Sequence, residues 1–173
     1  VMRESAQAAL TYTRAHARHL GLDPKMFDKV NIHINVPDGA TPKDGPSAGL
    51  GLATAVISAF TNRPARRDVA MTGEVTLRGK ALEIGGLKAK TIAAHRAGIK
   101  TVLLPKANAK DIPELPDRIR EDLTLITVGH LDEVLEIALL EAIAPPFSVP
   151  DEREAGRKVV PPVKKSKERP LSA

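Results

Sequence analysis

The chain has 173 residues, of which 42% are hydrophobic and 27% charged, the balance of an ordinary globular domain. This composition excludes a wholly disordered or collagen-like chain, and no apolar run is long enough to cross a membrane. Cysteine is absent, which excludes disulfides, thiolate zinc sites and a cysteine nucleophile, so covalent catalysis would need serine, threonine, lysine or a carboxylate.

The net charge of +5 is unevenly distributed along the chain. Residues 151–173 carry +3, so the first 150 residues carry only +2, a weak electrostatic attraction for nucleic acid. Aromatic residues, which would stack on bases, are scarce and comprise Tyr12, Phe27, Phe60 and Phe147. We therefore do not expect nucleic acid as a partner of this chain.

The first half of the chain predicts two helices and a strand. Apolar residues spaced three and four apart predict a helix over residues 2–20, with Gly21 as its C-cap. Strict alternation predicts a half-buried strand over 30–36. A loop rich in proline and glycine follows, and a small, apolar stretch predicts a buried helix over 47–60.

The second half alternates strands with helices, which is typical of an α/β domain. We expect short strands over 68–72, 74–77 and 80–84, a helix over 87–97, a strand over 100–104, a polar helical connection, a strand over 123–128 and a helix over 131–142. The domain is expected to span 1–144, as a fragment without its extreme N-terminal strands. Residues 145–173 combine proline pairs with a lysine-rich run and predict a disordered tail.

Ser47 stands out as a candidate nucleophile within the run Pro42-Lys43-Asp44-Gly45-Pro46-Ser47-Ala48-Gly49. It lies on a glycine-rich turn at the expected start of a helix, where unpaired amides could bind an oxyanion. An ordinary N-cap serine fits the same position. The run also matches the G-x-S-x-G elbow of esterases, with Asp122 and His130 available downstream, but a ten-residue loop separates Ser47 from the preceding strand.

Lysine is the alternative base for Ser47, because a neutral amine can accept the hydroxyl proton. Lys88 and Lys90 lie at the start of an alanine-rich helix. Residues two apart point about 200° from each other on a helix, so only one of the two can face inward. Taken alone, each lysine is more typical of an ordinary solvated surface charge than of a catalytic base.

Four blocks together resemble the C-terminal proteolytic domain of the Lon protease family. These are Pro42 to Gly49, Val69-Ala70-Met71-Thr72-Gly73-Glu74-Val75, Ile84-Gly85-Gly86-Leu87-Lys88-Ala89-Lys90 and Ala93-Ala94-His95-Arg96-Ala97-Gly98-Ile99-Lys100. Their order and spacing make the resemblance specific, and it covers about residues 1–140. It implies a single α/β proteolytic domain with mixed small sheets and packed helices.

The resemblance implies a Ser-Lys dyad of Ser47 and Lys90. It further implies that Thr72 orients the lysine, and that Asp44, Glu74 and Gly85 support the site. Asp44 and Glu74 could instead be a loop-capping residue and a surface carboxylate. Bacterial relatives often carry His-x-His before the serine loop, where this chain has His33-Ile34-Asn35, which leaves only secondary contacts in doubt.

The resemblance also implies a wider context for the chain. Family members degrade misfolded, damaged and short-lived regulatory proteins in the cytoplasm, as homohexamers that use ATP and Mg²⁺ in the full-length protein. We expect no cofactor in this chain, because its nearest phosphate-loop match, Gly73 to Ala81, has wrong spacing and lacks the following Ser/Thr. Besides a His-dependent esterase, the remaining alternative is a latent, non-catalytic assembly fragment without its ATPase.

Overall fold

A three-stranded parallel sheet forms the centre of the computed structural model, which describes residues 1–36 and 45–149. The strand order is β1 (Val69–Met71), β4 (Thr101–Pro105) and β5 (Thr124–Val128). Parallel neighbours need crossover connections, and here these contain α3 (Leu87–Arg96) and α4 (Asp117–Asp122). The expected α/β class is confirmed.

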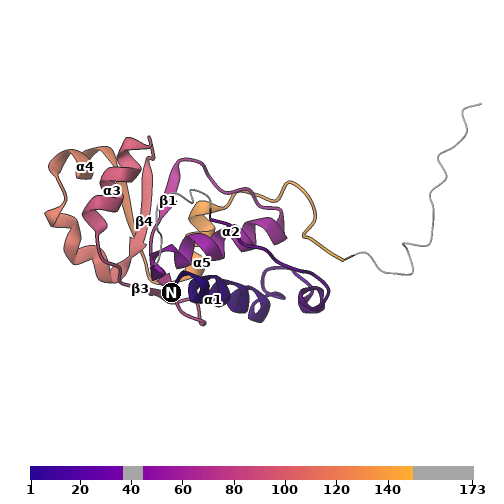
Figure 1. The fold of residues 1–173 in the computed structure, drawn as a ribbon. Coiled ribbons are helices and arrows are strands. Elements are labelled where there is room, and N and C mark those ends of the chain that lie inside the picture. Colours follow the sequence, from indigo (N-terminus) through magenta and orange to yellow (C-terminus); the bar gives the residue numbers. More distant parts are fainter. Residues whose placement is uncertain (37–44, 150–173) are drawn as a thin grey trace, which may run out of the picture.

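Successive side chains of the strands point to opposite faces of the sheet, and the apolar core accordingly forms two layers (Figure 1). On β4, Leu103 faces a cluster formed with α1 (Met2–Ala15), α2 (Gly49–Thr61) and α5 (Leu131–Ala138). Its neighbours Val102 and Leu104 face the other cluster, which α3 and α4 cover. Successive strand residues point to opposite faces, so a parallel sheet with helices on both sides buries both sets.

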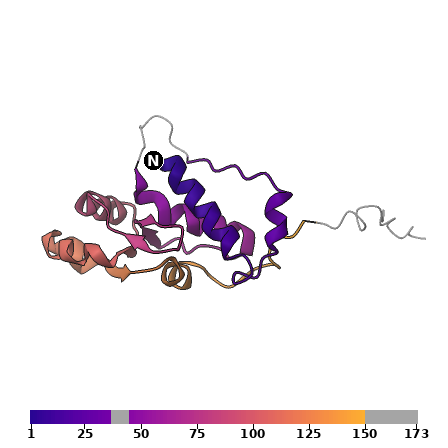
Figure 2. The same ribbon diagram turned by 90° about the horizontal axis from the view of Figure 1, so that it is seen from below.

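Helix α1 lies alongside α2 (Figure 2), and a small antiparallel hairpin connects this layer to the sheet. The hairpin consists of β2 (Glu74–Val75) and β3 (Ala81–Leu82). Its turn contains Gly79 at φ +82°, where a side-chain carbon would lie 2.5 Å from the Tyr12 ring and 2.7 Å from His130. Glycine satisfies both the left-handed conformation and the close approach at this turn.

The first predicted helix is shorter than expected. Helix α1 ends at Ala15, and the chain continues in turns to Gly21. The imidazole of His16 lies 2.9 Å from the Tyr12 carbonyl and stacks on the Tyr12 ring. The His16 side chain therefore pairs with a carbonyl of the last helical turn. Apolar spacing along the sequence does not show where the helix ends.

The predicted strand over 30–36 was wrong for the part of the chain that the structure describes. These residues form no regular element, because a strand is defined by backbone hydrogen bonds to a neighbour and no described segment supplies them. The alternating residues instead line an apolar groove against α2, together with Phe60 and Phe147.

The remaining elements follow the predictions with shifted ends. The three predicted strands after Pro64 shorten to β1, β2 and β3, and α5 ends at Ala138 rather than at 142. The polar connection comprises the 3₁₀ segment η3 (Lys106–Glu114) followed by α4. Within the described ranges, no helix combines the length and apolarity needed to span a bilayer.

The described part of the predicted tail, residues 145–149, lies against the end of α2. The Phe147 amide donates to the Phe60 carbonyl at 2.7 Å, and the two rings are 5.8 Å apart in an edge-on arrangement. Asn62 donates a hydrogen bond to the Pro145 carbonyl. Val149 packs against the cluster formed by Ala17, Leu22 and Met26. The remainder of the tail lies outside the described residues.

These contacts predict that two truncations of the tail will have different free energies of unfolding. Ending the chain after Val149 should change the free energy of unfolding by less than about 0.5 kcal/mol, because the composition of 150–173 offers little to bury. Ending it after Ala144 should cost about 1 kcal/mol or more, because the Phe147 ring and its hydrogen bond are lost. Urea unfolding of both truncations measures the difference, and equal stabilities would contradict it.

A second prediction compares two glycines of α2. A side-chain carbon on Gly49 would lie 2.8 Å from the Val75 amide nitrogen, whereas on Gly51 it would meet only Met71 at 3.9 Å. Both Gly→Ala changes gain about 0.5–1 kcal/mol of helix propensity. Gly51→Ala should therefore stabilise the chain, while Gly49→Ala should destabilise it by about 1–3 kcal/mol through overpacking. Urea unfolding of the matched pair tests this, and equal effects would refute the close approach.

Candidate active site

Ser47 lies in a short 3₁₀ turn, η2 (Pro46–Ala48), that leads directly into α2. Its side chain is half-buried, and its carbonyl accepts the Gly73 amide at 2.9 Å and the Thr72 hydroxyl at 3.4 Å. In return, the Leu50 amide donates to the Gly73 carbonyl at 3.0 Å. The start of α2 is thus hydrogen-bonded in both directions to the segment that follows β1.

The close contact at this point depends on two glycines. A side-chain carbon on Gly73 would lie 2.4 Å from the Leu50 side chain, and one on Gly49 would lie 2.8 Å from the Val75 amide nitrogen. Sequence reasoning gave Gly73 no role at the site. Its place inside the second motif block is the signal that could have found it.

Thr72 connects this segment to the central strand. Its side chain is only 6% exposed, and its amide donates to the Leu103 carbonyl of β4 at 3.0 Å. The Thr72 hydroxyl reaches the Ser47 carbonyl rather than a lysine. The structure therefore brings Thr72 to the backbone of Ser47, and the expected role of Thr72 in orienting the lysine stays a prediction.

Lys90 lies in the first turns of α3, and its side chain is half-buried while Lys88 is exposed. The Lys90 amine donates to the Gly85 carbonyl at 3.1 Å. Within residues 1–36 and 45–149, no hydrogen bond joins this amine to Ser47. The structure thus places Gly85 beside Lys90, and the direct Ser47–Lys90 contact stays a prediction.

Of the two predicted acidic residues, the structure describes only Glu74. Glu74 lies in β2 opposite Leu82, is half-buried, and lines a small cavity with Pro46 and Glu4. Asp44 lies outside the described residues. Supporting roles for both carboxylates stay predictions.

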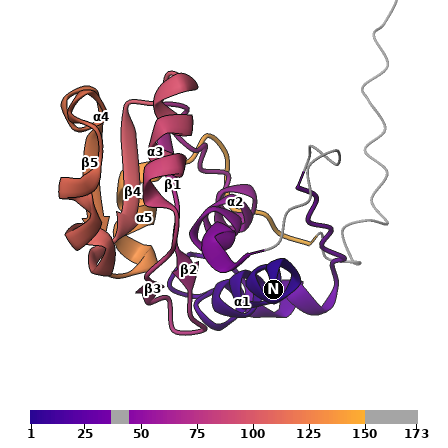
Figure 3. The ribbon, with the colours of Figure 1, turned by 60° about the vertical axis from the view of Figure 1, so that its left-hand side comes forward.

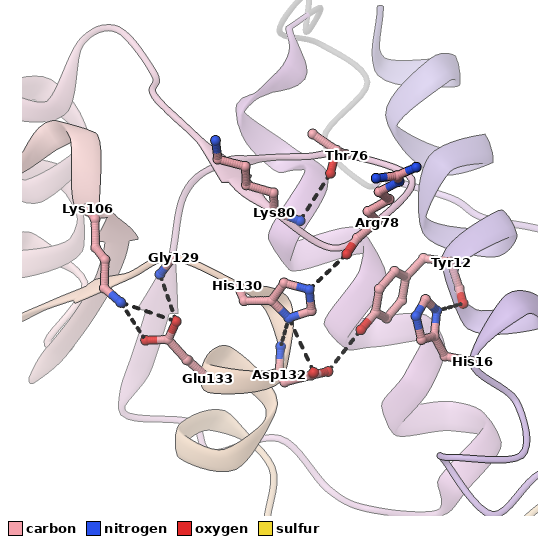
Figure 4. A network of polar contacts seen from close by, with 10 residues as sticks. All are labelled: Tyr12, His16, Thr76, Arg78, Lys80, Lys106, Gly129, His130, Asp132 and Glu133. Atoms are coloured by element: carbon pink, nitrogen blue, oxygen red, sulfur yellow. Dashed lines mark hydrogen bonds and ion pairs between the residues drawn. The ribbon is translucent and has the colours of Figure 1, made fainter.

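The histidines near the hairpin cap and pack the structure (Figure 4). His130 accepts the Asp132 amide at 3.2 Å, which caps α5, and donates to the Arg78 carbonyl at 2.8 Å. Tyr12 donates to the Asp132 carboxylate at 2.9 Å. Burial, with Asp132 as a second cause, raises the pKa of the Tyr12 hydroxyl above its ordinary value.

A second polar group in Figure 4 surrounds Glu133. Its carboxylate accepts the Gly129 amide at 3.0 Å and pairs with Lys106 at 3.4 Å. Burial works against ionisation, yet these donors hold the pKa of Glu133 below its ordinary value. The group joins the end of β5 to η3, so its role is to fix the loop before α5.

The acid and base of the esterase alternative belong to different pairs. Asp122 accepts from His95 at 2.6 Å at the outer ends of α3 and α4, whereas His130 is engaged by Asp132 and Arg78. The two residues therefore form no charge relay in this structure. No observation favours that alternative.

The near-match to a phosphate loop forms a different structure. Residues 73–81 contain the β2–β3 hairpin, and Gly79 packs against Tyr12 and His130. The Gly79 amide donates to the Thr76 carbonyl and the Lys80 amide to the Thr76 hydroxyl, and the expected absence of a nucleotide site stays a prediction. Across the described ranges, no group of three or more His, Asp or Glu side chains could hold a metal ion.

Comparison with known proteins decides the family. Residues 1–141 match the model of the Lon protease (S16) C-terminal proteolytic domain. The chain belongs to this Lon proteolytic-domain family. It is 65% identical over 139 residues to "Lon protease" of Chloroflexus aggregans and 58% identical over 140 residues to "Lon protease 1" of Bacillus subtilis.

These similarities cover most of this chain but little of the relatives. The match to the Chloroflexus protein spans 80% of this chain and 17% of the relative, and the match to the Bacillus protein spans 81% and 18%. "Lon protease 2" of Herpetosiphon aurantiacus, 60% identical over 140 residues, gives 81% and 17%. The chain thus spans less than a fifth of these curated Lon proteases.

The His95–Asp122 pair predicts a pH-dependent stability. The hydrogen bond from His95, aided by Arg118, lowers the pKa of Asp122. A lowered native pKa adds stability above the unfolded pKa of about 3.9, and this stability is lost as pH falls through the lower native pKa. The destabilisation caused by Asp122→Asn should therefore shrink between about pH 5 and about pH 3.

Urea unfolding at both pH values measures this change. Glu121→Gln, at the exposed neighbouring position on α4, is the matched control and should show a smaller change with pH. A destabilisation by Asp122→Asn that is the same at both pH values would contradict the assignment.

Proposed function

We propose that this chain is a serine endopeptidase domain in which Ser47 is the nucleophile and Lys90 the general base. The observation that carries the proposal is the position of Ser47. It lies at the start of α2, hydrogen-bonded to the segment at the carboxyl end of β1, in a chain that the Lon proteolytic-domain model matches. Ligands of parallel α/β sheets commonly bind at the carboxyl ends of the strands.

The proposed reaction proceeds through an acyl-enzyme. The neutral Lys90 amine takes the proton from the Ser47 hydroxyl, and the serine oxygen attacks the peptide carbonyl carbon. The tetrahedral intermediate then collapses, the peptide C–N bond breaks, and the protonated Lys90 gives its proton to the leaving amine. A water, deprotonated by Lys90, hydrolyses the ester and restores the Ser47 hydroxyl.

The oxyanion requires backbone donors near Ser47. Two amides at the start of α2 are already engaged, since Gly49 donates to the Pro46 carbonyl and Leu50 to the Gly73 carbonyl. The proposal therefore assigns the oxyanion to the amide of Ser47 itself, upstream of these two. The hydrogen bonds on the Ser47 carbonyl would fix the orientation of this peptide segment.

The position of Lys90 supports its role less directly. Its amine lies on the Gly85 carbonyl, in a loop of the third motif block, and Lys88 is exposed. One N–H bound to a carbonyl leaves the nitrogen lone pair of the neutral amine free to accept the serine proton. Thr72 would act on Ser47, whose carbonyl its hydroxyl contacts.

The proposal extends to the longer protein through its relatives. In that protein, ATP-dependent unfolding in a separate module would deliver misfolded, damaged or short-lived regulatory proteins to a homohexamer in the cytoplasm. ATP and Mg²⁺ would bind outside this chain, and no step above depends on them. The remaining alternative, a latent assembly fragment, differs by having no turnover in the isolated chain.

Replacing the dyad tests the proposal. Ser47→Ala and Lys90→Ala should each lower kcat for a fluorogenic peptide by roughly 10³-fold or more, because residues that act as one unit lose activity together. Lys90→Arg should not restore activity, because a guanidinium stays protonated. Thr72→Val should give an intermediate loss.

Lys88→Ala is the matched control, because Lys88 lies on the same helix two residues away and is exposed. It should retain most of the turnover. Near-native turnover by Lys90→Ala would refute the proposed base, and an inactive wild-type chain would favour the latent alternative.

A further inference from the structure

Asn108 is a buried polar residue that neither the motif blocks nor the proposed mechanism uses. It lies on η3 just after β4 and is 0% exposed. Its side-chain oxygen accepts the Ile84 amide at 3.1 Å, and its side-chain nitrogen donates to the Ile84 carbonyl at 2.8 Å. The same nitrogen donates to the Asp111 carboxylate at 2.7 Å.

This arrangement clamps one backbone residue from both sides. The Asn108 side chain accepts from the N–H of Ile84 and donates to its C=O, as a neighbouring strand would. It does so just beyond the end of β3 at Leu82. The bond to Asp111 fixes which end of the amide is the donor. Burying an amide without all these partners would be unfavourable, so the position of Ile84 is well determined.

The clamped residue directly precedes the carbonyl that holds Lys90. Gly85 accepts the Lys90 amine at 3.1 Å, and Gly86 follows at φ +70° as the N-cap of α3. The Lys90 backbone amide donates to the Gly86 carbonyl at 3.2 Å. The side-chain amine and the backbone amide of Lys90 are thus bound to Gly85 and Gly86, the two residues that follow the Ile84 held by Asn108.

We propose that Asn108 is a positioning residue for the general base: it holds the Ile84–Gly85 backbone so that the Gly85 carbonyl orients the Lys90 amine. This inference rests on the proposed function. Asn108 touches neither the substrate nor Ser47, and it acts only through the Gly85 carbonyl. Asp111 supports it by holding the amide orientation.

A nearby ion pair supplies a matched control. Lys110 pairs with Glu83 at 2.7 Å and so joins the same two segments, but through exposed side chains. Lys110→Met removes this link and leaves the Ile84 backbone bonds in place. A merely structural role for the contact between η3 and β3 would make this variant and Asn108→Ala behave alike.

The test compares Asn108→Ala with Lys110→Met in the peptidase assay, below the unfolding temperature of each variant. Asn108→Ala should lower kcat about 10-fold or more, because misplacing a reacting group slows the chemical step, while KM stays within about 3-fold. Lys110→Met should leave both constants near wild type. A kcat equal to that of Lys110→Met, or a loss expressed only in KM, would overturn the inference.

Two further measurements test the inference if Asn108→Ala folds poorly or if the chain shows no peptidase turnover. Asp111→Ala keeps Asn108 in place and should lower kcat by a smaller factor; an unchanged kcat would overturn the inference. The second measurement treats the protein with a small acetylating reagent. Mass spectrometry then gives the extent of acetylation of the Lys90 amine relative to that of the exposed Lys88. The Lys90 to Lys88 ratio should rise in folded Asn108→Ala or Asp111→Ala and not in Lys110→Met, and an unchanged ratio would overturn the inference.

The outcomes separate this inference from the proposed function. Retained turnover in Lys90→Ala would refute the base itself. Loss of turnover in Lys90→Ala with wild-type kcat in Asn108→Ala would refute only the positioning role.

Discussion

The arrangement of the candidate site depends on the crossing between the segment after β1 and the start of α2. Thr72 is bonded through its amide to Leu103 of the central strand, and Gly73 exchanges backbone hydrogen bonds with Ser47 and Leu50. The two backbones approach so closely that Gly49 and Gly73 have no room for a side chain. The start of α2 is therefore held against the segment that continues from β1 of the sheet.

The two proposed dyad residues come from opposite layers of the domain. Ser47 precedes α2, which packs on one face of the sheet, whereas Lys90 belongs to α3, which packs on the other face (Figures 1 and 3). Each layer has its own apolar cluster, and β4 contributes alternate residues to both. The distance between the proposed nucleophile and the proposed base is thus set by the sheet and by the loops at its carboxyl edge.

The polar side chains around these loops are mostly committed to fixing backbone. His130 caps α5, Glu133 binds the Gly129 amide, and Asn108 binds Ile84. Buried polar groups need such partners, and each bond also determines where the adjacent loop lies. His130 and Glu133, which lie outside the motif blocks, thus stabilise the loops beside them.

The sequence by itself determined the class of the fold, the family and most of the elements. Apolar spacing located α2 and α3, alternating strands and helices indicated an α/β domain, and the four motif blocks identified the family that the comparison then confirmed. These features are local or depend on residue identity, so they can be read along the chain.

The tertiary structure decided the features that depend on contacts between residues far apart in the sequence. Residues 30–36 alternate like a strand, but alternation fixes only the faces of an extended segment, and a strand also needs a hydrogen-bonded neighbour. The roles of Gly73 and Asn108 arise from contacts with Leu50 and Ile84, which are 23 and 24 residues away along the chain. No local pattern encodes such contacts, because they exist only once the helices and the sheet have packed.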